Sequence, residues 1–291
     1  MDEFDIVVIG GGSGGSAAAG RLSEDGKYSV CLIEAGGKNT DIRVRAPGLF
    51  PFLPPSTNWQ FETVPQPGLN GRTGYQPRGR GLGGSSAINA MVYIRGCAWD
   101  YDNWAALGCD GWAYKDVLPI FRRAESNVRG ADDYHGGDGP LTVSDQTHPN
   151  PGSVDFVEAA ASLQLPRNPD FNGARFEGVG LYQVTQRKGE RWSAARAYVE
   201  PARSRPNLDV RTGVLVERIV IDTSSAPLTL IFSARVAIAA GPSGVTYWSG
   251  CPATSFSSKR SCVSPCVVVN VQASRPVVPI MKNGRPGAVA P

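Results

Sequence analysis

The first 36 residues alternate between apolar runs and a glycine-rich turn. Residues 4–9 form a continuous apolar, largely β-branched run whose one polar member is Asp5, a pattern typical of a buried parallel strand. Residues 10–15 follow, and all of them except Ser13 are glycine. Small helix formers occupy residues 16–22, and a second apolar run, 30–33, ends at Glu34. This order of strand, glycine turn, helix, strand and acid predicts a βαβ unit.

Two later segments also carry periodic apolar positions. Residues 153–165 place Phe156, Val157, Ala160 and Leu163 near helical spacing, which predicts an amphipathic helix. The segment 207–221 has a strand-like pattern, with apolar residues at Leu208, Val210, Val214, Val216, Ile219, Val220 and Ile221. We therefore expect strands there, close in character to the two at the start of the chain.

Hydropathy gives no sign of a membrane span. No uncharged apolar run reaches the roughly 18 residues that a transmembrane helix needs, and the longest candidate, 228–240, is broken by Arg235. The chain starts directly with a strand-like run, which leaves no room for a basic leader and a cleavage site. We expect a cytoplasmic protein without a transmembrane segment.

Charge divides the chain into two unlike parts. All 26 acidic residues of the 291-residue chain lie at or before Asp222. The formal charge is therefore −3 over residues 1–222 and +6 over residues 223–291, and their sum is the overall +3. The basic excess comes wholly from the second part, so it does not indicate a nucleic-acid-binding protein. Charged residues make up 19% and hydrophobic residues 41%, as in a soluble globular chain.

Cysteines and aromatic residues add no separate site. The six cysteines match no zinc-binding spacing, so we expect no metal. The aromatic-rich stretch 97–112 resembles a stacking platform for nucleic acid, but no basic residues are interleaved with it. Packing in a core or a lid is the better interpretation, and we expect no nucleic-acid partner.

The first glycine run has the spacing of a dinucleotide-binding turn. Gly10 permits the sharp turn out of the strand, Gly12 allows close approach of a pyrophosphate, and Gly15 allows the helix to pack on the sheet. The start of the helix offers N–H groups to the anion. Glu34, 19 residues after Gly15, suits the ribose hydroxyls of NAD or FAD and disfavours NADP. A glycine-rich linker would not be framed by two buried strands, but the motif does not separate NAD from FAD.

A second glycine run carries a family resemblance. Residues 79–89, followed by Tyr93, Gly96 and Asp102, have small residues that allow close approach to a planar or anionic group. With them the chain resembles the glucose–methanol–choline (GMC) family of FAD-dependent oxidoreductases, and in detail its bacterial choline dehydrogenase and alcohol dehydrogenase branch. The likeness covers residues 1–222 and includes 58–59, 64–72, 135–141, 170–173, 178–180 and 191–198.

The resemblance implies an α/β fold (α+β overall) with a discontinuous domain arrangement. A Rossmann-like FAD-binding domain would comprise residues 1–150 and 207–222, and residues 151–206 would begin an inserted substrate-binding domain. The family's second signature is incomplete after Ala240, since its Ser-Pro pair and final glycine are missing. We therefore interpret 223–291 as an irregular tail, disordered or produced by a shifted reading frame, with a divergent but folded tail as the alternative.

The same resemblance assigns cofactor contacts. The phosphates would lie against Gly10, Gly12, Ser13, Gly14 and Gly15, and the adenosine ribose on Glu34 and Ala35. The flavin would lie along the stretch from Gly83 to Val92, closest to Asn89, Ala90, Met91 and Val92. Trp59 would contribute at the flavin edge and Val216 at the adenine. Ile88 occupies the position where some members carry a histidine that tethers FAD, so we expect non-covalent FAD.

The catalytic residue is not identified by the sequence. Oxidation of an alcohol CH–OH by hydride transfer to flavin N5 needs a base, usually histidine, and in the family this residue lies far downstream in longer chains. The chain has two histidines, of which His135 lies in a turn that is structural in the family and His148 in a loop. We expect an FAD-dependent oxidoreductase of a small alcohol, choline or another primary alcohol, in a chain that is truncated and lacks this base.

Three alternatives to a complete alcohol oxidoreductase stay open. The first is a non-catalytic FAD-binding remnant, and the second is an NAD-dependent dehydrogenase if the first glycine motif alone counts. The third is a lyase of the same family that binds FAD without redox chemistry. The electron acceptor is not indicated by any motif.

Overall fold

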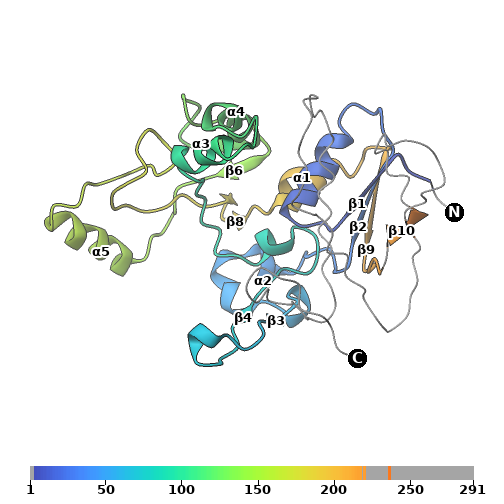
Figure 1. Ribbon diagram of the computed structural model, residues 1–291, viewed down its shortest axis with the longest axis horizontal. Helices are drawn as coiled ribbons and strands as arrows, with labels where there is room; N and C mark the ends of the chain where they lie inside the picture. The colour runs from blue at the N-terminus through green and yellow to red at the C-terminus, as the bar shows by residue number, and fades with distance from the viewer. Residues whose placement is uncertain (1–2, 218, 221–234, 237–291) are drawn as a thin grey trace.

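A computed structural model describes residues 3–217, 219–220 and 235–236. Its centre is a parallel sheet of three strands in the order β1-β2-β9, at the right of Figure 1. These strands are β1 (Ile6–Ile9), β2 (Val30–Glu34) and β9 (Leu208–Thr212). Val30 pairs with Ile6 on one side and Leu208 on the other, so β2 is the central strand. Its five residues are all buried, which explains its unbroken apolar run.

Five α-helices are described. They are α1 (Ser13–Leu22), α2 (Ile42–Arg45), α3 (Ala98–Ala106), α4 (Tyr114–Ala124) and α5 (Pro151–Ser162). Short 3₁₀ turns and one π-helical turn connect them: η1 (Pro47–Phe52), η2 (Pro55–Thr57), η3 (Pro67–Leu69), η4 (Gly84–Ala87) and the π-helical η5 (Ala195–Val199). The expected helices at 16–22 and 153–165 are therefore present, each beginning two or three residues earlier.

The remaining strands form two-stranded ladders. They are β3 (Phe61–Glu62) with β4 (Tyr75–Gln76), β5 (Glu125–Asn127) with β6 (Leu141–Val143), β7 (Gln186–Arg187) with β8 (Glu190–Arg191), and β10 (Ile219–Val220) with β11 (Arg235–Val236). The mixed α/β fold expected from the sequence is thus observed, with a parallel sheet at its centre. The expected strand through Val214 and Val216 is not, because the chain is irregular from 214 to 217.

The core has one cluster on each face of the sheet. Val8, Leu32 and Leu208 pack with Ala19 of α1 and with Val199 of η5, which covers the same face. A smaller cluster of Ile9, Cys31, Ile33 and Val216 lies on the other face. Val216 is therefore apolar because it packs against the sheet from a loop, not because it belongs to a strand.

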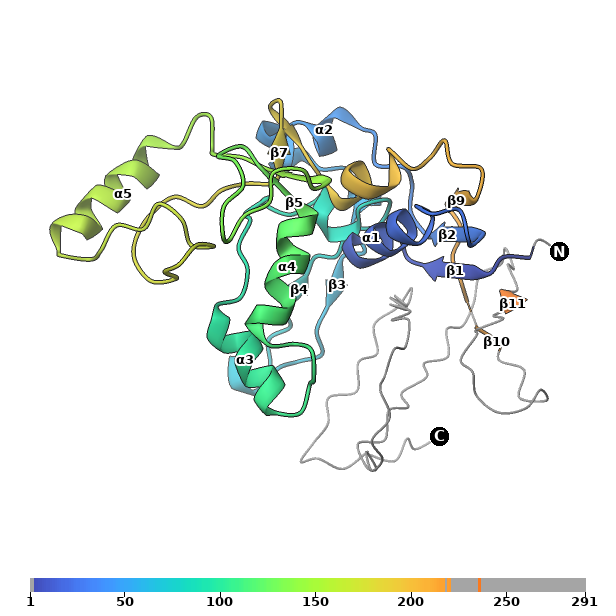
Figure 2. The same ribbon diagram turned by 90° about the horizontal axis from the view of Figure 1, so that it is seen from above.

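Helix α5 extends away from the rest of the described chain (Figures 1 and 2). Ala160 is its one buried residue. The α3–α4 region holds the aromatic stretch, where Tyr101 contacts Trp104 and Phe121 edge-on and Trp104 contacts Trp112. These rings pack on each other, as expected, but all of α3 stays at least partly exposed, so they do not form a core.

The expectation of an irregular or disordered tail over residues 223–291 lies outside the described residues, except at Arg235–Val236. Those two residues form β11, which pairs antiparallel with β10. No helix of the part of the chain that the structure describes is long and apolar enough to cross a membrane.

Candidate functional site: a pocket between two glycine turns

The two glycine runs, more than 60 residues apart in the sequence, lie in direct contact. The N–H of Gly83 donates to the carbonyl of Gly11 at 2.7 Å. A Cβ atom on Gly84 would come within 2.7 Å of Gly12 Cα, so a larger residue would separate the two turns. Gly10, with φ of 93°, makes the turn at the end of β1 in a conformation that favours glycine. Sequence spacing predicted each turn but not this contact.

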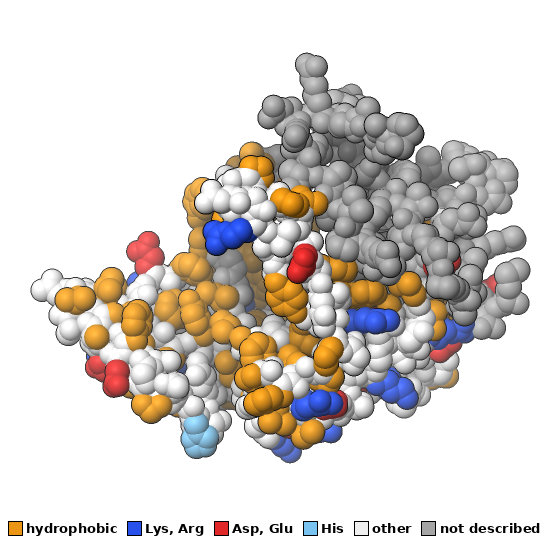
Figure 3. Space-filling view, turned by 90° about the horizontal axis from the view of Figure 1, so that it is seen from below, with side chains coloured by type: hydrophobic (Ala, Val, Ile, Leu, Met, Phe, Trp, Pro, Cys, Tyr) orange, Lys and Arg blue, Asp and Glu red, His pale blue; other side chains and the backbone are white. Residues whose placement is uncertain are grey.

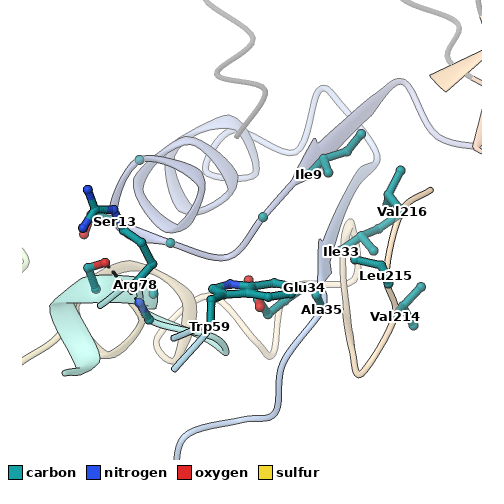
Figure 4. A pocket seen from close by; sticks show the side chains of 16 residues that line it. Ile9, Ser13, Ile33, Glu34, Ala35, Trp59, Arg78, Val214, Leu215 and Val216 are labelled. Atoms are coloured by element: carbon teal, nitrogen blue, oxygen red, sulfur yellow. Dashed lines mark hydrogen bonds between the residues drawn. The ribbon is translucent and has the colours of Figure 1, made fainter. Parts of the chain in front are cut away.

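A pocket of about 330 Å³ opens beside this junction (Figure 4). Its walls come from the end of β1, the start of α1, the end of β2, the second glycine turn and the loop after β9. The lining residues are Ile9, Gly10, Gly12, Ser13, Gly14, Ile33, Glu34, Ala35, Trp59, Arg78, Gly79, Gly84, Ser85, Val214, Leu215 and Val216. The pocket therefore lies at the carboxyl ends of parallel strands, where ligands bind in open α/β sheets.

Glu34 organises the pocket through its backbone partners. Its side chain accepts hydrogen bonds from the N–H groups of Gly11 (2.7 Å), Gly36 (2.7 Å) and Gly81 (2.9 Å). The residue is 6% exposed, so these bonds are made away from bulk water. The carboxylate thereby ties β2 to both glycine turns. Gly36 and Gly81 share Oε1 and Gly11 uses Oε2, so Oε2 has one acceptor position left, since a carboxylate can accept about four hydrogen bonds.

The start of α1 is suited to an anion. No acidic residue lies in its first turn, and no side chain caps its N-terminus. The first N–H groups of a helix have no acceptor within the helix and carry the positive end of its dipole. Helix and strand approach closely at Gly15, where a Cβ atom would overlap with the carbonyl oxygen of Gly10.

Arg78 adds the positive charge of the pocket. Its backbone is fixed on both sides, because Arg78 N donates to Asn58 Oδ1 at 2.9 Å and Trp59 N donates to Arg78 O at 2.8 Å. Figure 4 shows its side chain near Ser13, on the side of the pocket away from Val214–Val216. Arginine is well suited to bind phosphate oxygens. The polar half of the pocket thus combines a helix start, two serines and a guanidinium.

The structure gathers eight of the fourteen residues expected to contact the cofactor. Gly10, Gly12, Ser13, Gly14, Glu34, Ala35, Trp59 and Val216 line the pocket. Gly15 and Gly83 do not line it. Gly15 allows α1 to pack closely on the end of β1, and Gly83 donates its N–H to the carbonyl of Gly11. Asn89, Ala90, Met91 and Val92 do not line it.

The structure adds detail to the contacts that the sequence indicated. Trp59 lies beside Glu34 and Ala35 (Figure 4). Arg78, Val214 and Leu215 were not singled out as contacts. A signal existed for Arg78, since a cation directly before a glycine run is suited to a phosphate.

His135 lies outside this pocket in a buried ionic network. Its Nδ1 is 3.1 Å from both carboxylate oxygens of Glu125, and its Nε2 is 2.9 Å from Asp170 Oδ2. Glu125 also forms an ion pair with Arg95. The hydrogen bond to Glu125, followed by that to Asp170, raises the pKa of His135 against the opposing effect of burial.

Metal binding finds no support in the described ranges, which hold no group of three histidine, cysteine or acidic side chains arranged for an ion. Cys31 is buried in the sheet, and Cys97 and Cys109 are not joined in a disulfide.

The family model described as GMC oxidoreductase matches residues 4–235. Among curated proteins, an alcohol dehydrogenase [acceptor] of Pseudomonas putida is 44% identical over 226 residues, which is 77% of this chain and 41% of that protein. An oxygen-dependent choline dehydrogenase of Photobacterium profundum is 42% identical over 227 residues, covering 77% of this chain and 40% of that protein. The chain thus spans about two fifths of the length of the curated relatives it matches.

Solved structures of two oxidoreductases resemble this chain in fold. Pyridoxine 4-oxidase from Mesorbium loti superposes with a TM-score of 0.72 at 39% identity, covering 75% of this chain and 44% of that one. An FAD-dependent oxidoreductase from Chaetomium thermophilum gives a TM-score of 0.69 at 32% identity, covering 75% and 40%.

The extent of the match is close to the one expected. The sequence alone placed the end of the likeness at about residue 222; the family model continues to residue 235, and the curated relatives match 77% of the chain.

Proposed function

This chain belongs to the GMC oxidoreductase family, and on that premise we propose that its pocket binds FAD. The support is the contact between the two glycine turns over one pocket, with Glu34 tied to both. An NAD-dependent dehydrogenase would need only the first turn. NAD binding would therefore leave the second turn without a role. The similar protein from Chaetomium thermophilum is called an FAD-dependent oxidoreductase.

The lining residues fit an elongated dinucleotide. The start of α1 with Ser13, Gly14 and Arg78 would hold the phosphates, since these groups supply N–H donors and positive charge. Glu34 would accept from the ribose hydroxyls with its remaining oxygen position, and Val216 would pack on the adenine. The stretch 83–92 would lie along the flavin, outside the pocket described above. Ile88 offers no nucleophile, so the binding would be non-covalent.

FAD, once bound, is able to accept a hydride from the carbon of an alcohol, and the relatives named for alcohol and choline suggest that substrate class. This chain's own residues would bind the cofactor in an extended conformation. Of the two histidines of the chain, His135 is held between Glu125 and Asp170, and His148 is exposed. We therefore propose that this chain by itself binds FAD without turning over an alcohol. Residues 1–150 with 207–222 would form the FAD-binding unit, and 151–206 the start of a substrate-binding unit.

The test is a binding titration with purified protein. The fluorescence of FAD should be quenched or shifted when the protein binds it. FAD should also co-elute with the protein as a yellow complex, whereas NAD should not bind. Arg78→Met should weaken FAD binding about tenfold, because one charge-assisted contact to phosphate is lost. Arg72→Met, in an exposed loop that does not line the pocket, is the matched control. Binding of NAD in place of FAD would overturn the proposal.

A second measurement tests the missing turnover. The bound flavin should keep its visible absorbance when choline or a simple primary alcohol is added without oxygen. Bleaching by either compound would show that the chain supplies its own base.

A further inference from the structure

Arg191 is a buried cation without a carboxylate partner. Its residue is 1% exposed, and the residues that the structure describes offer it no ion pair. Burial alone lowers the pKa of this guanidinium to about 10. Arginine is rarely buried without a paired charge, because its transfer from water is costly. A residue kept in this state calls for a reason beyond packing.

The donors of Arg191 reach helix α2 and the end of the second glycine turn. Its Nε donates to Val44 O of α2 at 2.9 Å, and its Nη1 donates to Asn89 O at 2.7 Å and Asn89 Oδ1 at 2.9 Å. A longer bond of 3.3 Å reaches Ser86 O in η4. Nη2 is buried and has no hydrogen-bond partner in the described chain. The guanidinium thus clamps the end of the second glycine turn through neutral acceptors only.

Asn89 links Arg191 to Met91 through hydrogen bonds. The Oδ1 atom that accepts from Arg191 also accepts from Met91 N at 3.1 Å. Met91 has φ of 64°, in the left-handed region that is uncommon for a residue with a side chain. Its carbonyl is fixed in turn by Thr185 N at 2.9 Å. The backbone at Met91 therefore has a sparsely populated conformation, supported by contacts that lead from Arg191 through Asn89.

We propose that Arg191 is a positioning residue that sets the 86–91 loop, through Asn89, in the conformation that receives the flavin end of FAD. This inference rests on the proposed binding of FAD. It explains the absence of a carboxylate: a paired charge would be satisfied before the cofactor arrives, whereas an unpaired one favours binding of an anionic ligand. FAD should accordingly stabilise the native chain more than it stabilises a variant without this charge, by thermodynamic linkage.

The experiment compares FAD affinity, the visible circular dichroism of bound FAD, and the rise in melting temperature that FAD causes. Arg191→Met should raise the Kd for FAD by about 10- to 100-fold, since the two charge-assisted hydrogen bonds to Asn89 are lost, and should alter the dichroism. Arg191→Lys should recover part of the affinity, because it restores charge but not the fork. The matched control is Arg203→Met, because Arg203 is exposed and its side chain has no described contact; this variant should match wild type.

Asn89 separates positioning from general destabilisation. Asn89→Asp keeps the acceptor for Met91 N but pairs the charge of Arg191, so it should weaken FAD binding by about threefold, whereas Asn89→Leu removes the acceptor and should weaken binding further. The double variant Arg191→Met/Asn89→Leu should bind no more weakly than the worse single variant, since both break one path. The two single Asn89 variants also test the inference if Arg191→Met fails to fold.

Three results would overturn the inference. If wild type binds FAD while Arg191→Met keeps its Kd within about twofold and its dichroism unchanged, Arg191 is merely structural. Losses that add in the double variant would mean that Arg191 does not act through Asn89. If wild type itself binds no FAD, the proposed function fails, and this inference fails with it.

Discussion

Glu34 both holds the backbone of the two glycine turns and forms part of the pocket wall. Its carboxylate fixes three backbone N–H groups, at Gly11, Gly36 and Gly81, and it also lines the pocket. An acid at this position was expected from its distance to the first glycine turn, and its role in joining the two turns was not. The residue that would bind the ribose is therefore also one on which the shape of the pocket depends.

Replacing Glu34 by Gln should destabilise the fold by about 2 kcal/mol, because an amide N–H₂ would face at least one buried backbone donor. The measurement is the free energy of unfolding in urea, without cofactor. Glu62→Gln, at an exposed position, should change it by less than about 0.5 kcal/mol. Equal stability of Glu34→Gln and wild type would mean that the three N–H groups find other acceptors.

His135 should make stability depend on pH. Its pKa is raised in the folded chain by its bonds to Glu125 and Asp170, so the protonated form is favoured by folding. The stabilisation is fully present below the unfolded value of 6.5 and is lost as pH rises through the raised folded value. Urea unfolding of wild type and His135→Gln should therefore differ more at pH 6 than at pH 9.

The second histidine provides the control for this pH dependence. His148 is exposed, and His148→Gln should follow the wild-type pH profile throughout. A difference between wild type and His135→Gln that stays constant with pH would contradict the charged bridge between the two carboxylates.

Helix α1 is the element on which the pocket depends most. It packs on the sheet at Gly15 and against η5 at Gly20, where a Cβ atom would come within 2.8 Å of Tyr198 O. Both contacts are backbone against backbone, so neither leaves room for a side chain to move aside. The position of the helix start relative to β1 is therefore set by two small residues.

Gly15→Ala should cost about 3 kcal/mol of stability, because the added methyl group meets the carbonyl of Gly10 and α1 must shift. The free energy of unfolding in urea gives this number, and FAD affinity should fall with it. Gly68→Ala meets no atom within 4 Å and should be nearly neutral. If Gly15→Ala has the same free energy of unfolding as wild type, helix α1 can shift without loss of stability.

The sequence was most informative where one physical cause dominates. Strands β1 and β2 are buried, and their apolar runs were predicted nearly to the residue. Val214 and Val216 show the same pattern for another reason, because they line a pocket and pack on the sheet from a loop. Arg191 carried no local signal, since arginine is usually exposed and its burial depends on Val44 and Asn89, which lie far away in sequence.

On the scale of the whole molecule, the described chain exposes much apolar surface. Figure 3 shows hydrophobic side chains over one face, including the protruding end where α5 lies. Phe156 and Leu163, at and just after α5, are 69% and 78% exposed. The amphipathic pattern of 153–165 correctly predicted a helix, but its apolar side is not buried within the described residues. Such surface favours self-association.

Phe156→Lys with Leu163→Lys should leave the free energy of unfolding within about 1 kcal/mol of wild type, since little buried area is lost. The double variant should scatter less light at high concentration and bind less of a hydrophobic dye. The matched control is Phe171→Lys, because that ring is less exposed and packs on Tyr182, so it should destabilise the fold. A large loss of stability in the double variant would show that the apolar side of α5 is packed after all.

The order β1-β2-β9 has a consequence for synthesis of the chain. Val30 of β2 pairs with Leu208, which the ribosome adds 178 residues later. At roughly 5–20 residues per second this interval lasts about 9 to 36 s. During that time the apolar β2 has β1 on one side and an unpaired backbone edge on the other, which is a template for unwanted strand pairing. A chaperone that covers this edge should therefore raise the yield of soluble protein more than one that acts after release.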